Sequence, residues 1–133
     1  MTFLDTNIIL RFLTWDDPIK AERCEKLFKR VAAGKTTLFT STMVIAEVLW
    51  TLEKAYKIPK TQVARLVGKM LNTPNIHLDE KDTLLAALSL HELRNMDFID
   101  AYNAMVMQSK DIHAIYSYDK DFDLMPPIQR LEP

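Results

Sequence analysis

Short apolar runs alternate along the chain with longer segments in which apolar residues recur every three or four positions. Apolar runs bounded by turn residues predict strands, and the longer periodic segments predict amphipathic helices. The predicted strands span residues 2–4, 37–40, 75–78, 113–116 and 129–131. The predicted helices span residues 8–13, 16–33, 42–57, 60–71, 79–93 and 97–109. This alternation indicates an α/β fold with a mainly parallel sheet.

Length and composition indicate one folded domain over residues 1–133. Nearly half of the residues are apolar, which is enough to bury a core at this size. Cys24 is the single cysteine, so an internal disulfide is excluded, as is usual in a reducing cytoplasm. The apolar N-terminus is interrupted by Asp5 and Arg11 and is too short for a membrane span or a secretory signal. We therefore expect a cytoplasmic protein with no membrane partner.

Charge is distributed unevenly, although the net charge is only −1. Residues 1–35 carry seven basic and five acidic side chains, and residues 53–69 carry five and one. Residues 77–133 carry five basic and eleven acidic side chains. A basic first half and an acidic second half could bind phosphates on one face and cations on another. The simpler alternative is that these charged residues lie on ordinary solvent-exposed helix faces, which would give the same distribution.

Acidic and polar residues follow the predicted strands at the point where each strand ends. Asp5 follows the first strand, Ser41 and Thr42 follow the second, and Asp119 follows the fourth. Ligands bind at the carboxyl ends of the strands in open parallel sheets, so these groups are expected to share one edge. Glu47 lies a little more than one turn into the helix that follows Thr42.

A cluster of carboxylates at one edge predicts a site for a hard divalent cation. Like charges repel unless a cation or protons offset them, and oxygen ligands suit Mg²⁺ or Mn²⁺. A cation held in this way can activate a water for hydrolysis of a phosphodiester. Each acid also has a simpler explanation: Asp5 could cap the following turn, and Glu47 and Asp100 could pair with lysine or arginine inside their apolar segments. Asp119 shares its turn with Asp121 and Asp123.

Four segments, in order and at the expected spacing, resemble the motifs of the PIN-domain nucleases, and among them the VapC-type toxins of toxin–antitoxin pairs. The segments are LDTN, STMVIAEVLWTL, MDFIDAYNAM and YSYDKDFD. The resemblance implies that the acidic residue of each motif binds metal and takes part in catalysis: Asp5, Glu47, Asp100 and Asp119. It implies supporting roles for the polar residues beside them: Thr6, Asn7, Ser41, Thr42 and Ser117.

The same resemblance implies a five-stranded, mainly parallel sheet flanked by helices on both sides. It also implies an endoribonuclease that depends on Mg²⁺ or Mn²⁺, forms a homodimer and is inhibited by a cognate antitoxin. Tyr102 and Asn103 replace the small residues usual after the third acidic residue, and Tyr118 stands where small or apolar residues are common. These departures remove no ligand, but they could alter how RNA or the antitoxin fits.

Four residues are candidate RNA contacts: Arg11, Lys54, Lys57 and Tyr118. Arginine and lysine would bind phosphates, and the tyrosine ring would stack on a base. The simpler alternatives are a surface ion pair for Arg11 and a solvated helix face for the lysines. Two other functions stay open: a non-catalytic PIN-like RNA-binding or scaffold domain, and a phospho-acceptor signalling domain. The helical positions of Glu47 and Asp100 argue against the second.

Overall fold

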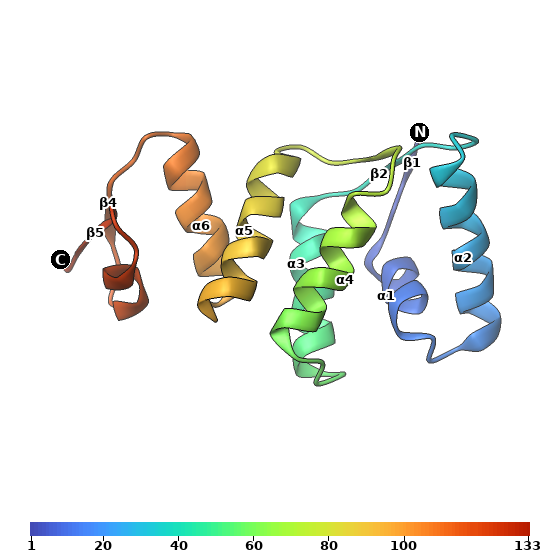
Figure 1. The fold of residues 1–133 in the computed structure, drawn as a ribbon, viewed down its shortest axis with the longest axis horizontal. Helices are drawn as coiled ribbons and strands as arrows, with labels where there is room; N and C mark the ends of the chain where they lie inside the picture. Colours follow the sequence, from blue (N-terminus) through green and yellow to red (C-terminus); the bar gives the residue numbers. More distant parts are fainter. The chain divides into compact units, whose positions relative to one another are not determined.

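The structure, a computed structural model, describes residues 1–133 and divides into two compact units, Met1–Lys81 and Asp82–Pro133 (Figure 1). The first unit contains β1 (Thr2–Phe3), α1 (Thr6–Thr14), α2 (Pro18–Ala32), β2 (Leu38–Phe39), α3 (Thr42–Lys54), α4 (Lys60–Leu71) and β3 (Ile76–His77). Helix α5 (Lys81–Arg94) begins at the boundary. The second unit continues with α6 (Phe98–Ser109), β4 (Ala114–Tyr116), the 3₁₀ helix η1 (Lys120–Leu124) and β5 (Gln129–Leu131).

The first unit has a parallel sheet in the order β1-β2-β3. Its hydrogen bonding continues one residue past the strands, because the Leu4 amide donates to Phe39 and the Thr40 amide donates to His77. The buried Thr40 hydroxyl also donates to the Leu4 carbonyl at 2.9 Å. This bond joins β1 and β2 at their carboxyl ends, where the chain turns into α1 and α3.

Local signals in the sequence set the helix ends of this unit. Asp17 caps α2 by accepting from the Lys20 amide, and Pro18 is the first helical residue. Gly34 has a φ of +75° just after α2, a conformation that glycine adopts without strain, and its amide donates back to Val31. Ser41 caps α3 by accepting from the Val44 amide. These starts and stops confirm the sequence prediction.

The core of the first unit is made by apolar faces of its helices and strands. Helix α1 packs against α2 and α3, and α3 packs against α4 (Figure 1). Phe12 and Phe28 stack across the α1–α2 contact, with ring centroids 4.2 Å apart. The largest buried side chains of this unit include Leu4, Ile9, Ile45, Leu49, Leu52, Val63, Leu71 and Ile76.

The second unit is built on two helices and a small parallel sheet of β4 and β5. His91 is fully buried on α5, where its ring meets Phe98 edge-on and its Nδ1 atom bonds the Met96 carbonyl. The imidazole therefore ties the end of α5 to the start of α6, which gives His91 a structural role. Phe122 is the buried residue of η1.

The predicted α/β class is confirmed, but the predicted single five-stranded sheet is wrong. The five strands form one three-stranded and one two-stranded sheet. Strands inside a parallel sheet are normally buried on both faces. Ala114 and Tyr116 of β4 are exposed, and β4 hydrogen-bonds to β5 alone. With only two or three residues in each strand, apolar runs in the sequence do not determine which strands pair.

None of the helices combines the length and the apolar character needed to cross a membrane.

We predict that Thr40→Val lowers the free energy of unfolding by about 1–2 kcal/mol, because it removes a buried donor and leaves the Leu4 carbonyl without that bond. Urea unfolding followed by circular dichroism measures the change. Thr2→Val, at an exposed position of the same sheet, serves as the matched control and should change stability by less than about 0.5 kcal/mol. Equal stability of the two variants would contradict the role of Thr40.

Candidate functional site

The first unit places Asp5, Thr6 and Glu47 around the turn from β1 into α1. Asp5 is the residue before α1, and its exposed carboxylate makes no capping hydrogen bond. The buried Thr6 hydroxyl donates to Glu47 Oε2 at 2.7 Å. Glu47 is exposed on α3, and its partner is this hydroxyl rather than a lysine or an arginine. The simple explanations for both acids therefore do not apply here.

Three polar residues near these acids lie between the end of β2 and the start of α3. Thr40 holds the ends of β1 and β2 together, and Ser41 caps α3. Thr42 is the first residue of α3. By fixing the end of β2 and the start of α3, Thr40 and Ser41 set where Glu47 emerges from the helix. Of the supporting residues expected in this unit, Thr6 alone contacts a predicted ligand directly, and Asn7 lies exposed at the start of α1.

The second unit brings Asp100, Asp119 and Asp121 together. One carboxylate oxygen from each lies within 4.8 Å of the others. Asp100 lies in the first turn of α6, and Asp119 precedes η1, where it accepts from the Asp121 amide at 2.9 Å. Oxygen ligands at this spacing suit a hard divalent cation such as Mg²⁺ or Mn²⁺. The donor set therefore fits the predicted cofactor class.

Burial and the neighbouring acids together shift the acidity of Asp100. The pKa of this carboxyl is raised from its ordinary value of 3.8 to about 6, first by burial and then by the hydrogen bond with Asp119 and the charge of Asp119. The charges of Asp97 and Asp121 make smaller contributions to the same shift. At neutral pH the cluster therefore holds more negative charge than its surroundings favour, and a cation would relieve that repulsion.

Arg130 holds the turn that presents Asp119. Its guanidinium donates to the Ser117 carbonyl at 3.0 Å, to Asp123 at 2.9 Å and to Glu132 at 2.7 Å. The Ser117 hydroxyl accepts from the Asp119 amide at 3.0 Å. Ser117 therefore supports Asp119 through the backbone, and Asp123 is engaged with Arg130.

Two pairs of predicted ligands lie in different units. The first unit holds Asp5 and Glu47, with Thr6 linking the chain beside Asp5 to Glu47. The second unit brings Asp100 and Asp119 together. The meeting of all four carboxylates involves both units and stays a prediction.

The candidate RNA contacts lie on the surface of the two units. Arg11 forms an ion pair with Asp16 at 2.8 Å, the simpler alternative considered for it, and Tyr56 donates to the same carboxylate. Lys54 and Lys57 are exposed after the second motif. Tyr118 is 72% exposed, so its ring is accessible for stacking.

Sequence reasoning left Asp121 undecided and missed Arg130. Asp119, Asp121 and Asp123 alternate in one short segment, so the sequence does not show which of them turn toward Asp100. The 3₁₀ helix separates them, turning Asp121 into the cluster and Asp123 toward Arg130. The sequence does not indicate this role for an arginine in the last strand, because the turn that it holds, at Ser117, lies thirteen residues earlier.

We predict that Asp100→Asn stabilises the metal-free protein at pH 7.5 by on the order of 1 kcal/mol, after allowing for solvent screening. Folding raises the pKa of this carboxyl from 3.8 to about 6, so the wild-type protein loses stability as the pH rises through that interval and the group ionises. The stability gained by Asp100→Asn should therefore disappear at pH 4. Thermal unfolding at both pH values in EDTA measures it. Asp82→Asn, at an exposed acid of α5, is the control. A gain of equal size at both pH values would contradict the raised pKa of Asp100.

We predict that Arg130→Met weakens Mn²⁺ binding about tenfold, because the turn that carries Asp119 loses its anchor. Calorimetric titration with Mn²⁺ measures the affinity, and circular dichroism checks that the variant is folded. Glu132→Gln removes one outward partner of Arg130 and should leave the affinity within about twofold of wild type. Unchanged Mn²⁺ affinity in a folded Arg130→Met protein would show that the turn does not need this anchor.

Comparison with known proteins agrees with the motifs. The sequence model of the PIN domain family matches residues 2–126. The chain is 26% identical over 122 residues to a protein described as VapC ribonuclease from Aquifex aeolicus (strain VF5), covering 92% of this chain and 90% of that relative. Superposition on the crystal structure of Mycobacterium tuberculosis VapC20, described as a Sarcin-Ricin loop cleaving toxin, gives a TM-score of 0.43 at 22% identity and covers 100% of both chains.

The family match extends over nearly the whole chain and includes the positions of all four motif acids, Asp5, Glu47, Asp100 and Asp119. The chain therefore belongs to the PIN domain family.

Proposed function

We propose that this protein is a divalent-metal-dependent endoribonuclease that hydrolyses RNA phosphodiester bonds, and that it is the toxin of a type II toxin–antitoxin pair. The observation that carries the proposal is the carboxylate cluster that joins two motif acids, Asp100 and Asp119, with Asp121 in a chain that belongs to the PIN domain family. Similarity to a relative described as a VapC ribonuclease supports RNA as the substrate, and the resemblance of the four motifs to VapC-type toxins supports a cognate antitoxin as the partner. We infer that it acts in the cytoplasm as a homodimer.

In this proposal residues 1–133 work as one nuclease domain, and Asp5, Glu47, Asp100 and Asp119 together hold Mg²⁺ or Mn²⁺. Thr6 orients Glu47 through its hydrogen bond, and Ser117 supports the turn of Asp119. Asp121, within reach of the same site, adds negative charge or a further ligand. Such a cation supplies charge stabilisation for the phosphate and raises the acidity of an attacking water.

The acidic residues have a second task in the proposed reaction. Their unpaired charge repels an RNA phosphate when no cation is bound, so productive binding of the scissile group depends on the ion. Arg11, Lys54 and Lys57 would hold the flanking phosphates, and Tyr118 would stack on a base. A non-catalytic RNA-binding or scaffold domain is the alternative, and it would need neither the cation nor the acidic cluster.

We predict that Asp5→Asn and Asp100→Asn each reduce RNA cleavage at least about 100-fold while the fold is retained, because each removes a charged oxygen from the cation site. Asp121→Asn should reduce cleavage about tenfold. Asp82→Asn removes an exposed acid of α5 outside the cluster and should cleave like wild type. Cleavage of a labelled RNA with Mn²⁺, using protein purified free of contaminating ribonuclease, measures the rates.

The alternative function is separated by binding measurements on the same proteins. Calorimetry should show Mn²⁺ binding to wild type and a loss of affinity in Asp100→Asn. Wild-type protein that binds RNA but neither binds millimolar Mn²⁺ nor cleaves would establish the scaffold function. Full activity in either Asp5→Asn or Asp100→Asn would show that the site residues are wrongly assigned.

A further inference from the structure

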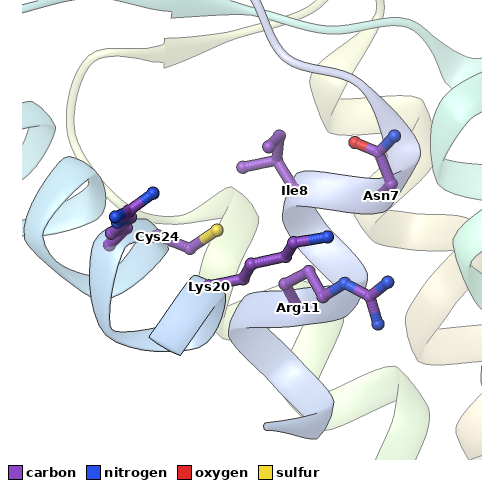
Figure 2. A pocket seen from close by; sticks show the side chains of 6 residues that line it. Asn7, Ile8, Arg11, Lys20 and Cys24 are labelled. Atoms are coloured by element: carbon purple, nitrogen blue, oxygen red, sulfur yellow. The ribbon is translucent and has the colours of Figure 1, made fainter. Parts of the chain in front are cut away.

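An open cavity of about 340 Å³ lies between α1 and α2; four of its six lining residues are cationic or polar, although most of its lining surface is apolar (Figure 2). Its lining residues are Asn7, Ile8, Arg11, Lys20, Arg23 and Cys24. Figure 2 shows the Lys20 ammonium and the Arg11 guanidinium extending on the same side of the cavity as Asn7. No acidic side chain lines the cavity, so its walls carry three positive charges.

Helical spacing explains why these side chains share one space. Asn7 and Arg11 are four residues apart on α1, so they lie on one face of the helix. Lys20, Arg23 and Cys24 are three and four residues apart on α2 and form the facing surface. The stacking of Phe12 on Phe28 holds the two helices together beside the cavity. The cationic groups are thus positioned by a packed helix pair.

Acids outside the cavity compensate this charge in part, because Asp16 pairs with Arg11 and Asp17 approaches Lys20. Asp16 binds Arg11 through Nη1 and also accepts from Tyr56, which orients the guanidinium. Asp17 lies 3.9 Å from the Lys20 ammonium, at the limit of an ion pair, and is occupied as the cap of α2. Cys24 stays a neutral thiol because burial raises its pKa. Lys20 and Arg23 are exposed and available to an anion from solvent.

The position of the cavity along α1 connects it with the first metal-binding motif. Asn7 comes two residues after Asp5 and directly after Thr6, whose hydroxyl holds Glu47. Arg11 follows one helical turn further on, about 6 Å along the axis from Asn7. A polyanion that starts at the acidic residues of this turn and follows α1 would therefore meet Asn7, Lys20 and Arg11.

We propose that this cavity binds a backbone phosphate of the RNA, close along the strand to the phosphate that is cleaved. The proposal rests on the proposed nuclease function and adds a second anchoring point to it. Arginine and lysine donors suit phosphate oxygens, and two arginines beside one lysine offer more donors than a single carboxylate can accept. An RNA strand also supplies a phosphate at the spacing of every nucleotide, whereas an acidic protein segment would have to match this one cavity.

The test compares two double variants of α2 that remove the same charge. The cavity variant, Lys20→Gln with Arg23→Gln, removes two positive charges from the cavity wall. The control variant, Lys26→Gln with Lys29→Gln, removes the charges of two exposed lysines on the same helix, which pair with Glu22 and Glu25. Binding of a fluorescently labelled, short single-stranded RNA is followed by anisotropy in EDTA, so that no cleavage occurs. Circular dichroism verifies that both variants are folded.

We expect the cavity variant to bind RNA about tenfold more weakly and the control variant to stay within about twofold of wild type. The slope of log K against the logarithm of the salt concentration, where K is the association constant for RNA, should become shallower by about 0.7 for each RNA phosphate that the variant no longer neutralises. Equal weakening in the two variants, or unchanged binding in the cavity variant, would overturn the proposal. So would an absence of RNA binding by the wild type.

Two further binding measurements test whether the cavity binds other anions, with inorganic phosphate and an oligoglutamate peptide as the probes. If either probe binds wild type and loses affinity in the cavity variant while RNA binding is unchanged, the cavity serves free phosphate or an acidic protein segment and the proposal is wrong. Cleavage with Mn²⁺ is measured separately. A wild type that binds RNA through the cavity without cleaving it would refute the nuclease function, while binding of an RNA phosphate by the cavity would stand.

Discussion

Repulsion between carboxylates that are held close together is the constraint on which the rest of the site depends. Asp100 and Asp119 face each other across the start of α6 and the turn before η1, and Asp121 lies beside them. The chain keeps this arrangement although it raises the pKa of Asp100 to about 6. Folding energy from the buried core of the domain must offset that cost, which is typical of sites that are completed by a cation.

The surrounding structure holds the acids in place through neutral and cationic groups outside the cluster. Arg130 binds the Ser117 carbonyl, while Asp123 and Glu132 balance its charge. In the first unit a threonine hydroxyl, rather than a cation, holds Glu47. Because Arg130 pairs with Asp123 and Glu132, and a neutral hydroxyl holds Glu47, these contacts leave the negative charge of Glu47, Asp100 and Asp119 in place.

Much of this organisation could be predicted from the sequence, because it is encoded locally. Caps such as Asp17 and Ser41, and the glycine after α2, mark helix ends with short-range hydrogen bonds. The set of four motif acids came from the resemblance to PIN-domain motifs, and their joint role as ligands stays a prediction. Strand pairing could not be predicted, since strands of two or three residues carry little pairing information. The role of Arg130 was also hidden, because it depends on β5 lying next to β4.

The hydrogen bond from Thr6 to Glu47 has a consequence for ion selectivity. It occupies Oε2 and leaves Oε1 as the unencumbered oxygen of that carboxylate. Calcium commonly takes both oxygens of a glutamate in a loose shell of six to eight ligands, whereas magnesium requires a compact octahedron and accepts one. In a site that used Glu47 as a ligand, the buried hydroxyl of Thr6 at the start of α1 would therefore disfavour the larger ion, although calcium and magnesium carry the same charge.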